Sequence, residues 1–276
     1  MFEHSMNNLI FGNAFDILSN IESNTIDLIV TDPPYHISYQ NATWDKKDEF
    51  YTNTEQWVKE CIRILKPHGS MWSFMGYQNV IPFIEICNKY ATVQLDNWSI
   101  WARNKGRGST KKLKSLREDI IHVTKHPKIH TWNKLSVCRE VIAPYVKDGK
   151  PRGWILDNET GKRIRWTGLG NVFWYNAPQH NSIAEKQYHP CQKPVMLIQR
   201  LILLSSNPQE VVLDPFMGVG TTPIACITTN RNYIGIENDS KWYNIAKDKI
   251  ENLDITKFSQ YNLWTDHQIN LKKNQS

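Results

Sequence analysis

The sequence predicts an α/β fold in which helices cover a doubly wound, mostly parallel sheet of seven strands. Three observations support this fold class. Short apolar, β-branched runs alternate along the chain with segments of helical period. Two of these runs end abruptly in an acid and a proline, at Asp32-Pro33 and at Asp214-Pro215. The chain has 276 residues, which is long enough to bury the core of one large domain.

Buried parallel strands are typically continuous runs of aliphatic and β-branched residues. Ile26–Thr31 is such a run, and Pro33 and Pro34 follow it closely. Proline cannot donate to a strand ladder, so the strand must end there. The seven runs that predict strands are Asn8–Phe11, Ile26–Thr31, Met71–Phe74, Trp98–Ala102, Asp119–Thr124, Val211–Leu213 and Tyr233–Ile236.

Helices are predicted where apolar residues recur on one face. Thr54–Lys66 places Trp57 and Cys61 on one side and is followed by Pro67-His68-Gly69, a typical helix stop. Asp239 is expected to cap the last long helix. The predicted helical segments are a brief turn ending at Leu18, then Thr54–Lys66, Val80–Tyr90, Val195–Ser205, Thr221–Thr229 and a segment from Asp239 to about Leu253.

Residues 126–188 differ in character from the rest of the chain. They contain four tryptophans and several glycines and prolines, and they show no sustained helical period. We therefore predict one domain in two halves, residues 1–125 and 189–276, interrupted by an irregular or β-rich insertion over residues 126–188. The polar segment His36–Phe50 is a candidate mobile loop beside the ligand crevice.

Charge and cysteine content narrow the functional classes. Residues 101–130 carry nine Lys/Arg and two acids, so the net charge of this stretch is +7. The whole chain has a net charge of +6, so the remaining residues sum to −1. The five cysteines form no Cys-x-x-Cys pair, and the histidines show no metal spacing, so neither a disulfide framework nor a metal is expected. No run is long and apolar enough to span a membrane and Met1–Asn8 lacks a signal-peptide pattern, so we expect a cytoplasmic protein.

Asp32-Pro33-Pro34-Tyr35 forms a stiff loop at the carboxyl end of a predicted parallel strand. Open α/β sheets place their ligand crevices at such ends. The Asp32 carboxylate and the proline carbonyls can accept hydrogen bonds, while Tyr35 offers a flat aromatic face. This combination suits a planar group that bears N–H donors.

The second loop, Asp214–Thr222, joins a predicted strand to a helix. Gly218 and Gly220 permit close approach of a ligand, and Thr221 and Thr222 bring hydroxyls to a helix N-terminus that favours a carboxylate. Glu237 ends the next strand, where an acid can hold ribose hydroxyls. No third glycine completes a dinucleotide fingerprint, so a nucleoside with a carboxylate-bearing tail fits better than NAD.

Together these motifs resemble those of the β subgroup of amino DNA methyltransferases, enzymes that use S-adenosylmethionine to methylate adenine N6 or cytosine N4. The two loops Thr31–Tyr35 and Asp214–Thr222 match the paired signatures of that family. Cys61–Ser70 resembles the segment after its catalytic loop, and His189–Pro194 resembles its HPxQKP segment. The similarity covers nearly the whole chain except residues 126–188.

The resemblance implies a Rossmann-like methyltransferase fold, with residues 126–188 as a target-recognition region. It also implies that the Asp32 carboxylate and the Pro33 carbonyl hold the amine of an adenine flipped out of duplex DNA, with Tyr35 stacked on the base and Pro34 completing the loop. Asn13 stands where many relatives have an aspartate. The expected set of S-adenosylmethionine contacts is Asn13, Asp32, Lys193, Asp214, Phe216, Gly218, Gly220, Thr221, Thr222 and Glu237.

Double-stranded DNA is the expected macromolecular partner. The cations expected to bind it are Arg103, Lys105, Arg107, Lys111, Lys112 and Lys114. Because relatives are often dimers, a second copy of the chain is a candidate partner, and a restriction endonuclease is a further candidate.

Two alternatives to adenine-N6 methylation stay open on the sequence. Cytosine-N4 enzymes more often carry serine at the position of Asp32, so Asp32 favours adenine. A DNA-binding module without catalysis is the second alternative, and an intact Asp32, Tyr35 and Glu237 argue against it. Pro190-Cys191 resembles the nucleophile of cytosine-C5 enzymes, but it precedes the cofactor loop instead of following it, so we interpret Cys191 as incidental.

Overall fold

The computed structural model describes residues 7–35, 50–107, 111, 113–140, 146–148, 150–151, 153–157, 161–178, 188–189, 191–258 and 263–265. Within these ranges the chain divides into two compact units. The first comprises Met1–Trp132 with Asn171–Ser259, and the second comprises Asn133–Gly170 with Gln260–Ser276. The expected His36–Phe50 loop lies outside the described residues except for Phe50.

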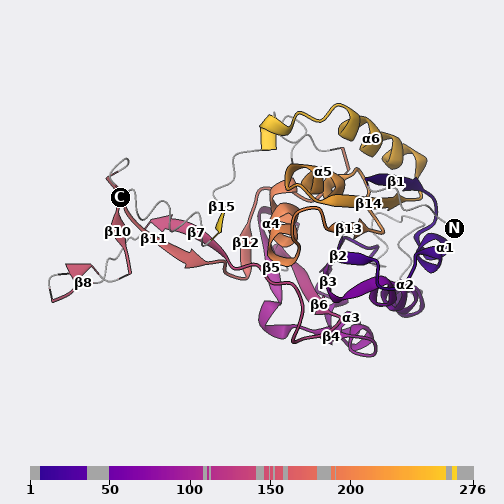
Figure 1. Ribbon diagram of the computed structural model, residues 1–276, viewed down its shortest axis with the longest axis horizontal. Coiled ribbons are helices and arrows are strands. Elements are labelled where there is room, and N and C mark those ends of the chain that lie inside the picture. Colours follow the sequence, from indigo (N-terminus) through magenta and orange to yellow (C-terminus); the bar gives the residue numbers. More distant parts are fainter. Residues whose placement is uncertain are drawn as a thin grey trace. The chain divides into compact units, whose positions relative to one another are not determined.

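The first unit is built on one mixed sheet, drawn in Figure 1. Its strands follow the order β1-β14-β13-β2-β3-β6-β5-β12, with β4 paired to β6. Their bounds are β1 Asn8–Phe11, β2 Ile26–Thr31, β3 Leu65–Met75, β4 Thr92–Val93, β5 Ser99–Arg107, β6 Ser115–Thr124, β12 Val172–Trp174, β13 Val211–Asp214 and β14 Asn232–Glu237. All seven predicted strands are present. The two additional strands, β4 and β12, are too short to carry a period-2 or apolar-run signal.

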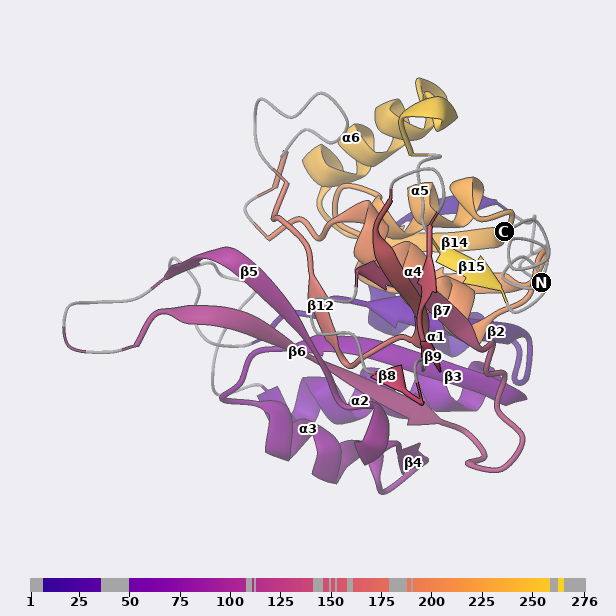
Figure 2. The same cartoon turned by 90° about the vertical axis from the view of Figure 1, so that its left-hand side faces the viewer.

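The helices cover both faces of this sheet. Figures 1 and 2 show α1 to α3 on one face and α4 to α6 on the other, as in a doubly wound fold. Their bounds are α1 Ala14–Asn20, α2 Phe50–Ile64, α3 Val80–Cys87, α4 Val195–Ser205, α5 Thr221–Thr228 and α6 Ser240–Glu251. The predicted cap of α6 is confirmed, because the Asp239 carboxylate accepts from the backbone N–H groups of Lys241 and Trp242.

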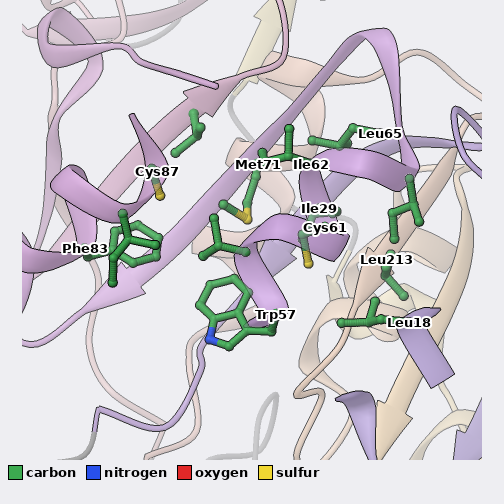
Figure 3. Packing of buried hydrophobic residues seen from close by; sticks show 14 of the residues in the cluster. Leu18, Ile29, Trp57, Cys61, Ile62, Leu65, Met71, Phe83, Cys87 and Leu213 are labelled. Carbon is green, nitrogen blue, oxygen red and sulfur yellow. The ribbon is translucent and has the colours of Figure 1, made fainter. Parts of the chain in front are cut away.

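The core on the α1–α3 face is built around β2, whose six residues are all buried. Figure 3 shows Leu18, Trp57, Cys61 and Phe83 packed over the sheet residues Ile29 and Met71. The rings of Trp57 and Phe83 stack with centroids 5.9 Å apart. Cys61 and Cys87 are buried free thiols in this core.

The predicted helix stop at Pro67-His68-Gly69 lies inside β3, because α2 already ends at Ile64. Ile26 of β2 pairs with Leu65 of β3, and Leu28 pairs with Ser70. The four β3 residues 66–69 therefore lie opposite the single β2 residue Asp27 and form a bulge. Lys66 Nζ reaches both carboxylate oxygens of Asp27, at 2.8 and 2.9 Å. A Cβ at Gly69 would lie 2.9 Å from the Asp27 carbonyl oxygen, so only glycine permits this close approach.

One strand, β6, runs antiparallel to its neighbours β3, β4 and β5, so its start, and not its end, lies at the crevice edge. In the β3–β6 ladder, Met75 pairs with Asp119, so the start of β6 lies beside the end of β3. Trp101 of β5 pairs with Glu118 of β6. Residues at the start of β6 therefore share the edge at which β2 delivers Asp32.

The second unit contains an antiparallel sheet with strand order β10-β11-β7-β15. The strands are β7 Leu135–Glu140, β10 Ile155–Leu156, β11 Arg163–Gly168 and β15 Leu263–Thr265, with a separate pair β8 Val146–Lys147 and β9 Lys150–Pro151. Its bounds differ from the expected insertion of residues 126–188. Residues 172–174 form β12 of the main sheet instead, and a C-terminal strand, β15, joins β7. The target-recognition role of residues 126–188 stays a prediction.

No helix in the described part of the chain combines the length and the apolar character that a membrane span requires.

Candidate active site

A cavity of about 610 Å³ lies at the carboxyl ends of the central strands of the first unit. The two loops singled out in the sequence both line it: Asp32, Pro33, Pro34 and Tyr35 from the first, and Asp214, Phe216, Gly218, Thr221 and Thr222 from the second. Asn13, Lys193 and Glu237 also line it. A volume of this size is typical of a site for a cofactor or another small molecule.

Asp32 is the polar centre of one half of the cavity. The Tyr35 hydroxyl donates to its Oδ1 at 2.6 Å. Its Oδ2 forms an ion pair with Lys193 Nζ. Burial raises the pKa of Asp32, and the positive charge of Lys193 acts against that rise. Both carboxylate oxygens therefore already accept a hydrogen bond from the protein itself.

Lys193 is a buried cation shared between two carboxylates. Its side chain is 5% exposed, and its Nζ lies 3.1 Å from Glu118 Oε2 as well as against Asp32. Burial disfavours the charge, but the two carboxylates outweigh burial and hold the pKa of Lys193 above its usual range. The rings of Phe74 and Trp101 lie 5.1 and 5.9 Å from the ammonium, close enough for cation–π attraction.

Tyr35 is fixed at both its backbone and its ring. The Asn79 side-chain amide donates to the Tyr35 carbonyl. A Cβ on Gly76 would lie 3.2 Å from Tyr35 Cδ2, so the missing side chain allows the ring to lie close to the end of β3. Burial raises the pKa of Tyr35 well above its usual value, so its hydroxyl stays protonated and acts as a donor.

The second loop is organised by Asp214, which is 4% exposed. Its Oδ1 accepts from the Phe216 backbone N–H at 3.1 Å, and its Oδ2 accepts from the Thr222 hydroxyl at 2.6 Å. The Thr222 hydroxyl thus donates its hydrogen bond within the loop, and not to a ligand in the cavity. Gly220 has φ +80°, and its Cβ would meet Ala246 at 3.0 Å, so glycine is required there on two grounds.

Glu237 connects two loops at the end of β14. Its carboxylate accepts from the backbone N–H groups of Gly218 and Asp239, each at 2.9 Å. Each carboxylate oxygen retains lone pairs for a further donor. Asn13 caps α1 through its side-chain oxygen, which accepts from the Phe15 N–H at 3.0 Å. Both side chains border the cavity, and their contacts with a nucleoside stay a prediction.

The predicted DNA-binding cations separate into different groups. Arg103 belongs to the cavity wall, where its Nη1 pairs with Glu118 Oε1 at 2.9 Å. Lys111 and Lys114 are exposed near the start of β6. Lys112, and the side chains of Lys105 and Arg107, lie outside what the structure describes.

Sequence reasoning missed Glu118 as a site residue. The only available signal was its place as one of two acids within a stretch of nine cations. Its position in the cavity depends on the antiparallel direction of β6, which the apolar-run pattern does not reveal.

Asp214 gives a pH dependence of stability. Burial raises its pKa from 3.8 to about 7. Between those values the folded protein holds a proton that the unfolded chain has released, so the free energy of unfolding falls as the pH rises. We expect Asp214→Asn to reduce the fall between about pH 5 and about pH 8 by roughly 2 kcal/mol.

Chemical denaturation at both pH values measures this difference. The matched control is Asp96→Asn, which removes an exposed carboxylate. An equally steep fall in wild type and Asp214→Asn would contradict the assignment of a raised pKa to Asp214.

Comparison with known proteins identifies the family. Residues 26–248 match the family model N6_N4_Mtase, described as DNA methylase. The type II methyltransferase M.HpaI of Haemophilus parainfluenzae is 34% identical over 246 residues, which cover 88% of this chain and 74% of that protein. The DNA adenine methyltransferase YhdJ of Escherichia coli (strain K12) is 31% identical over 258 residues, covering 91% and 84%.

Among solved structures, the M1.HpyAVI–SAM complex aligns with a TM-score of 0.59 at 23% identity, covering 90% of this chain and 100% of that one. At this identity the likeness supports the fold alone, a Rossmann-like α/β methyltransferase sheet. Since the family model matches most of the chain and the relatives exceed 30% identity over most of their own length, this protein belongs to the N6_N4_Mtase family of DNA methylases.

Proposed function

We propose that the protein transfers a methyl group from S-adenosylmethionine to the N6 amine of an adenine flipped out of duplex DNA. The observation that carries this proposal is the single cavity bordered by both the Asp32–Tyr35 loop and the Asp214–Thr222 loop. One loop offers acceptors and an aromatic face for a base. The other offers the strand–helix turn and the acid suited to a nucleoside.

The amine of adenine is a poor nucleophile because its lone pair is delocalised into the ring. Asp32 and the Pro33 carbonyl accept hydrogen bonds from the two N–H groups of this amine. This arrangement favours a pyramidal nitrogen whose lone pair points out of the ring plane. Tyr35 holds the base by stacking, since the amine cannot be reached inside the duplex. Orientation and electrostatic stabilisation are therefore the protein's contributions.

The residues of the second loop fit S-adenosylmethionine. A Cβ built on Gly218 meets no atom within 4 Å, so open space adjoins this turn. The Glu237 Oε2 atom accepts a hydrogen bond from the Gly218 backbone nitrogen at 2.9 Å. The carboxylate retains acceptor capacity for ribose hydroxyls. When bound, this cofactor supplies a methyl group activated on a sulfonium sulfur. Phe216 and Gly218 border the methionine end of the proposed site, and Glu237 borders the ribose.

Adenine is preferred to cytosine because YhdJ is named an adenine methyltransferase and because Asp32 stands where serine is more common in cytosine-N4 enzymes. Cytosine N4 is the second candidate, since its amine has the same chemistry. Homodimer formation and a restriction endonuclease partner stay predictions.

Methyl transfer from labelled S-adenosylmethionine to unmethylated duplex DNA, followed by nucleoside analysis, tests this function. We expect N6-methyladenine from the wild type. Asp32→Ala removes the acceptor of the amine proton, so we expect its rate to drop by about a hundredfold or more.

The matched control is Asp96→Ala, which removes an exposed carboxylate outside the cavity and should leave the rate unchanged. N4-methylcytosine as the product would keep the reaction and overturn the choice of base. Bound cofactor and bound DNA without any methylated product would contradict the proposed function.

Exposed cations near the start of β6 are proposed to hold the DNA backbone. Lys114 is exposed and one residue before Ser115, which borders the cavity. Each lysine that contacts a phosphate adds about one to the slope of log K against log salt. We expect Lys114→Gln to weaken DNA binding and to lower that slope by about one.

Fluorescence anisotropy over a series of salt concentrations measures the slope. Lys89→Gln serves as the control, because Lys89 is exposed, pairs with Glu55 and does not border the cavity. Equal slopes for Lys114→Gln and Lys89→Gln would exclude Lys114 from the DNA interface.

A further inference from the structure

Four charged side chains form an alternating chain in the wall of the cavity. Asp32 pairs with Lys193, Lys193 lies 3.1 Å from Glu118, and Glu118 lies 2.9 Å from Arg103. The side chains of Glu118 and Arg103 are 16% and 21% exposed, so this pair is partly buried. They come from three separate parts of the sheet and from the segment before α4.

This arrangement conflicts with the role proposed for Asp32. Its two carboxylate oxygens are engaged by Lys193 and by the Tyr35 hydroxyl. Each oxygen keeps a lone pair for the amine, but the Lys193 ammonium competes for the same negative charge and so weakens Asp32 as an acceptor. For the amine to bind well, Lys193 must give up part of its contact with Asp32.

A buried ammonium without an anionic partner is costly. Lys193 avoids that cost only if a second carboxylate remains in contact with it. Glu118 is within 3.1 Å of its Nζ, and Arg103 holds Glu118 from the other side. Lys193 can therefore withdraw from Asp32 and still be paired.

We propose that Glu118 is a positioning residue for methyl transfer: it retains the Lys193 ammonium when Asp32 accepts the target amine. The inference rests on the proposed function, because it assigns Asp32 to the amine. Glu118 acts through Lys193 and does not touch the reacting atoms.

The same geometry predicts opposite pH effects of Lys193 and Glu118. Lys193 stabilises ionised Asp32, whereas the negative charge of Glu118 raises the pKa of Asp32. Other titratable groups in this part of the cavity are Tyr35 on the same loop, Cys191 beside Lys193 and Asp214 at the end of β13. They stay the same in both variants described below, so they do not account for a shift in opposite directions.

The test compares Glu118→Gln and Lys193→Gln with the wild type in steady-state methylation of duplex DNA across pH. Glu118→Gln should lower kcat/KM for DNA by about ten- to a hundredfold, because Lys193 then stays on Asp32. It should leave the Kd for S-adenosylmethionine unchanged. The acid limb of kcat/KM should move to lower pH in Glu118→Gln and to higher pH in Lys193→Gln, by roughly one unit each.

Glu118→Asp keeps the charge, so its acid limb should stay at the wild-type position. Glu55→Gln is the matched control, because Glu55 also pairs with a lysine, Lys89, but does not border the cavity. It should behave as wild type. If Glu118→Gln fails to bind cofactor, Glu118→Asp and Lys193→Gln decide the question by the same pH readout.

The outcomes separate this inference from the proposed function. If the wild type methylates DNA and both glutamine variants shift the acid limb in the same direction, or neither shifts it, the positioning role of Glu118 is wrong and the function stands. If the wild type binds cofactor and DNA but yields no methylated base, the proposed function fails, and the inference fails with it.

Discussion

The contact between Asp32 and Lys193 is the interaction on which the site depends. It joins the end of β2 to the segment that opens α4, across 161 positions of sequence. A buried lysine of this kind is tolerated only where carboxylates surround it, and here Asp32 and Glu118 do so. The pair therefore forms part of the cavity wall and at the same time engages the carboxylate that the reaction is proposed to use.

The second constraint is the common edge of the parallel strands. β2 and β13 are neighbours in the sheet, with Val212 paired to Leu28 and Leu213 to Ile29. Their ends deliver Asp32 and Asp214 to the same cavity, although 182 positions separate these residues in sequence. The loops proposed to hold the base and the methyl donor thereby adjoin without either having to reach across the sheet. This explains how two short motifs at opposite ends of the chain can form one site.

Much of this arrangement could be predicted from sequence, and for a physical reason. Strands buried on both faces, such as Ile26–Thr31, produce apolar runs, and Asp214–Thr222 needs glycine for its positive φ angles. Local signals of this type identify elements and turns. The cap at Asp239 was predictable on the same basis.

What the sequence could not predict depends on long-range pairing. Glu118 lines the cavity because β6 runs antiparallel to β3. Arg103 lies close enough to pair with Glu118 because Trp101, two residues earlier in β5, is the strand partner of Glu118. The helix stop expected at Pro67-His68-Gly69 was placed too late, since the Lys66 side chain and the close approach of Gly69 to Asp27 hold that segment in β3. β12 gave no signal because three residues are too few for a pattern.

The most direct test of the account is a crystal structure of the protein with a non-reactive S-adenosylmethionine analogue and duplex DNA that carries the unmethylated target site. The account predicts a flipped base stacked on Tyr35, its amine within hydrogen-bonding distance of Asp32, and the analogue against Gly218 and Glu237. It also predicts Lys193 held by Glu118. A base bound elsewhere, with Asp32 still occupied only by Lys193 and Tyr35, would contradict it.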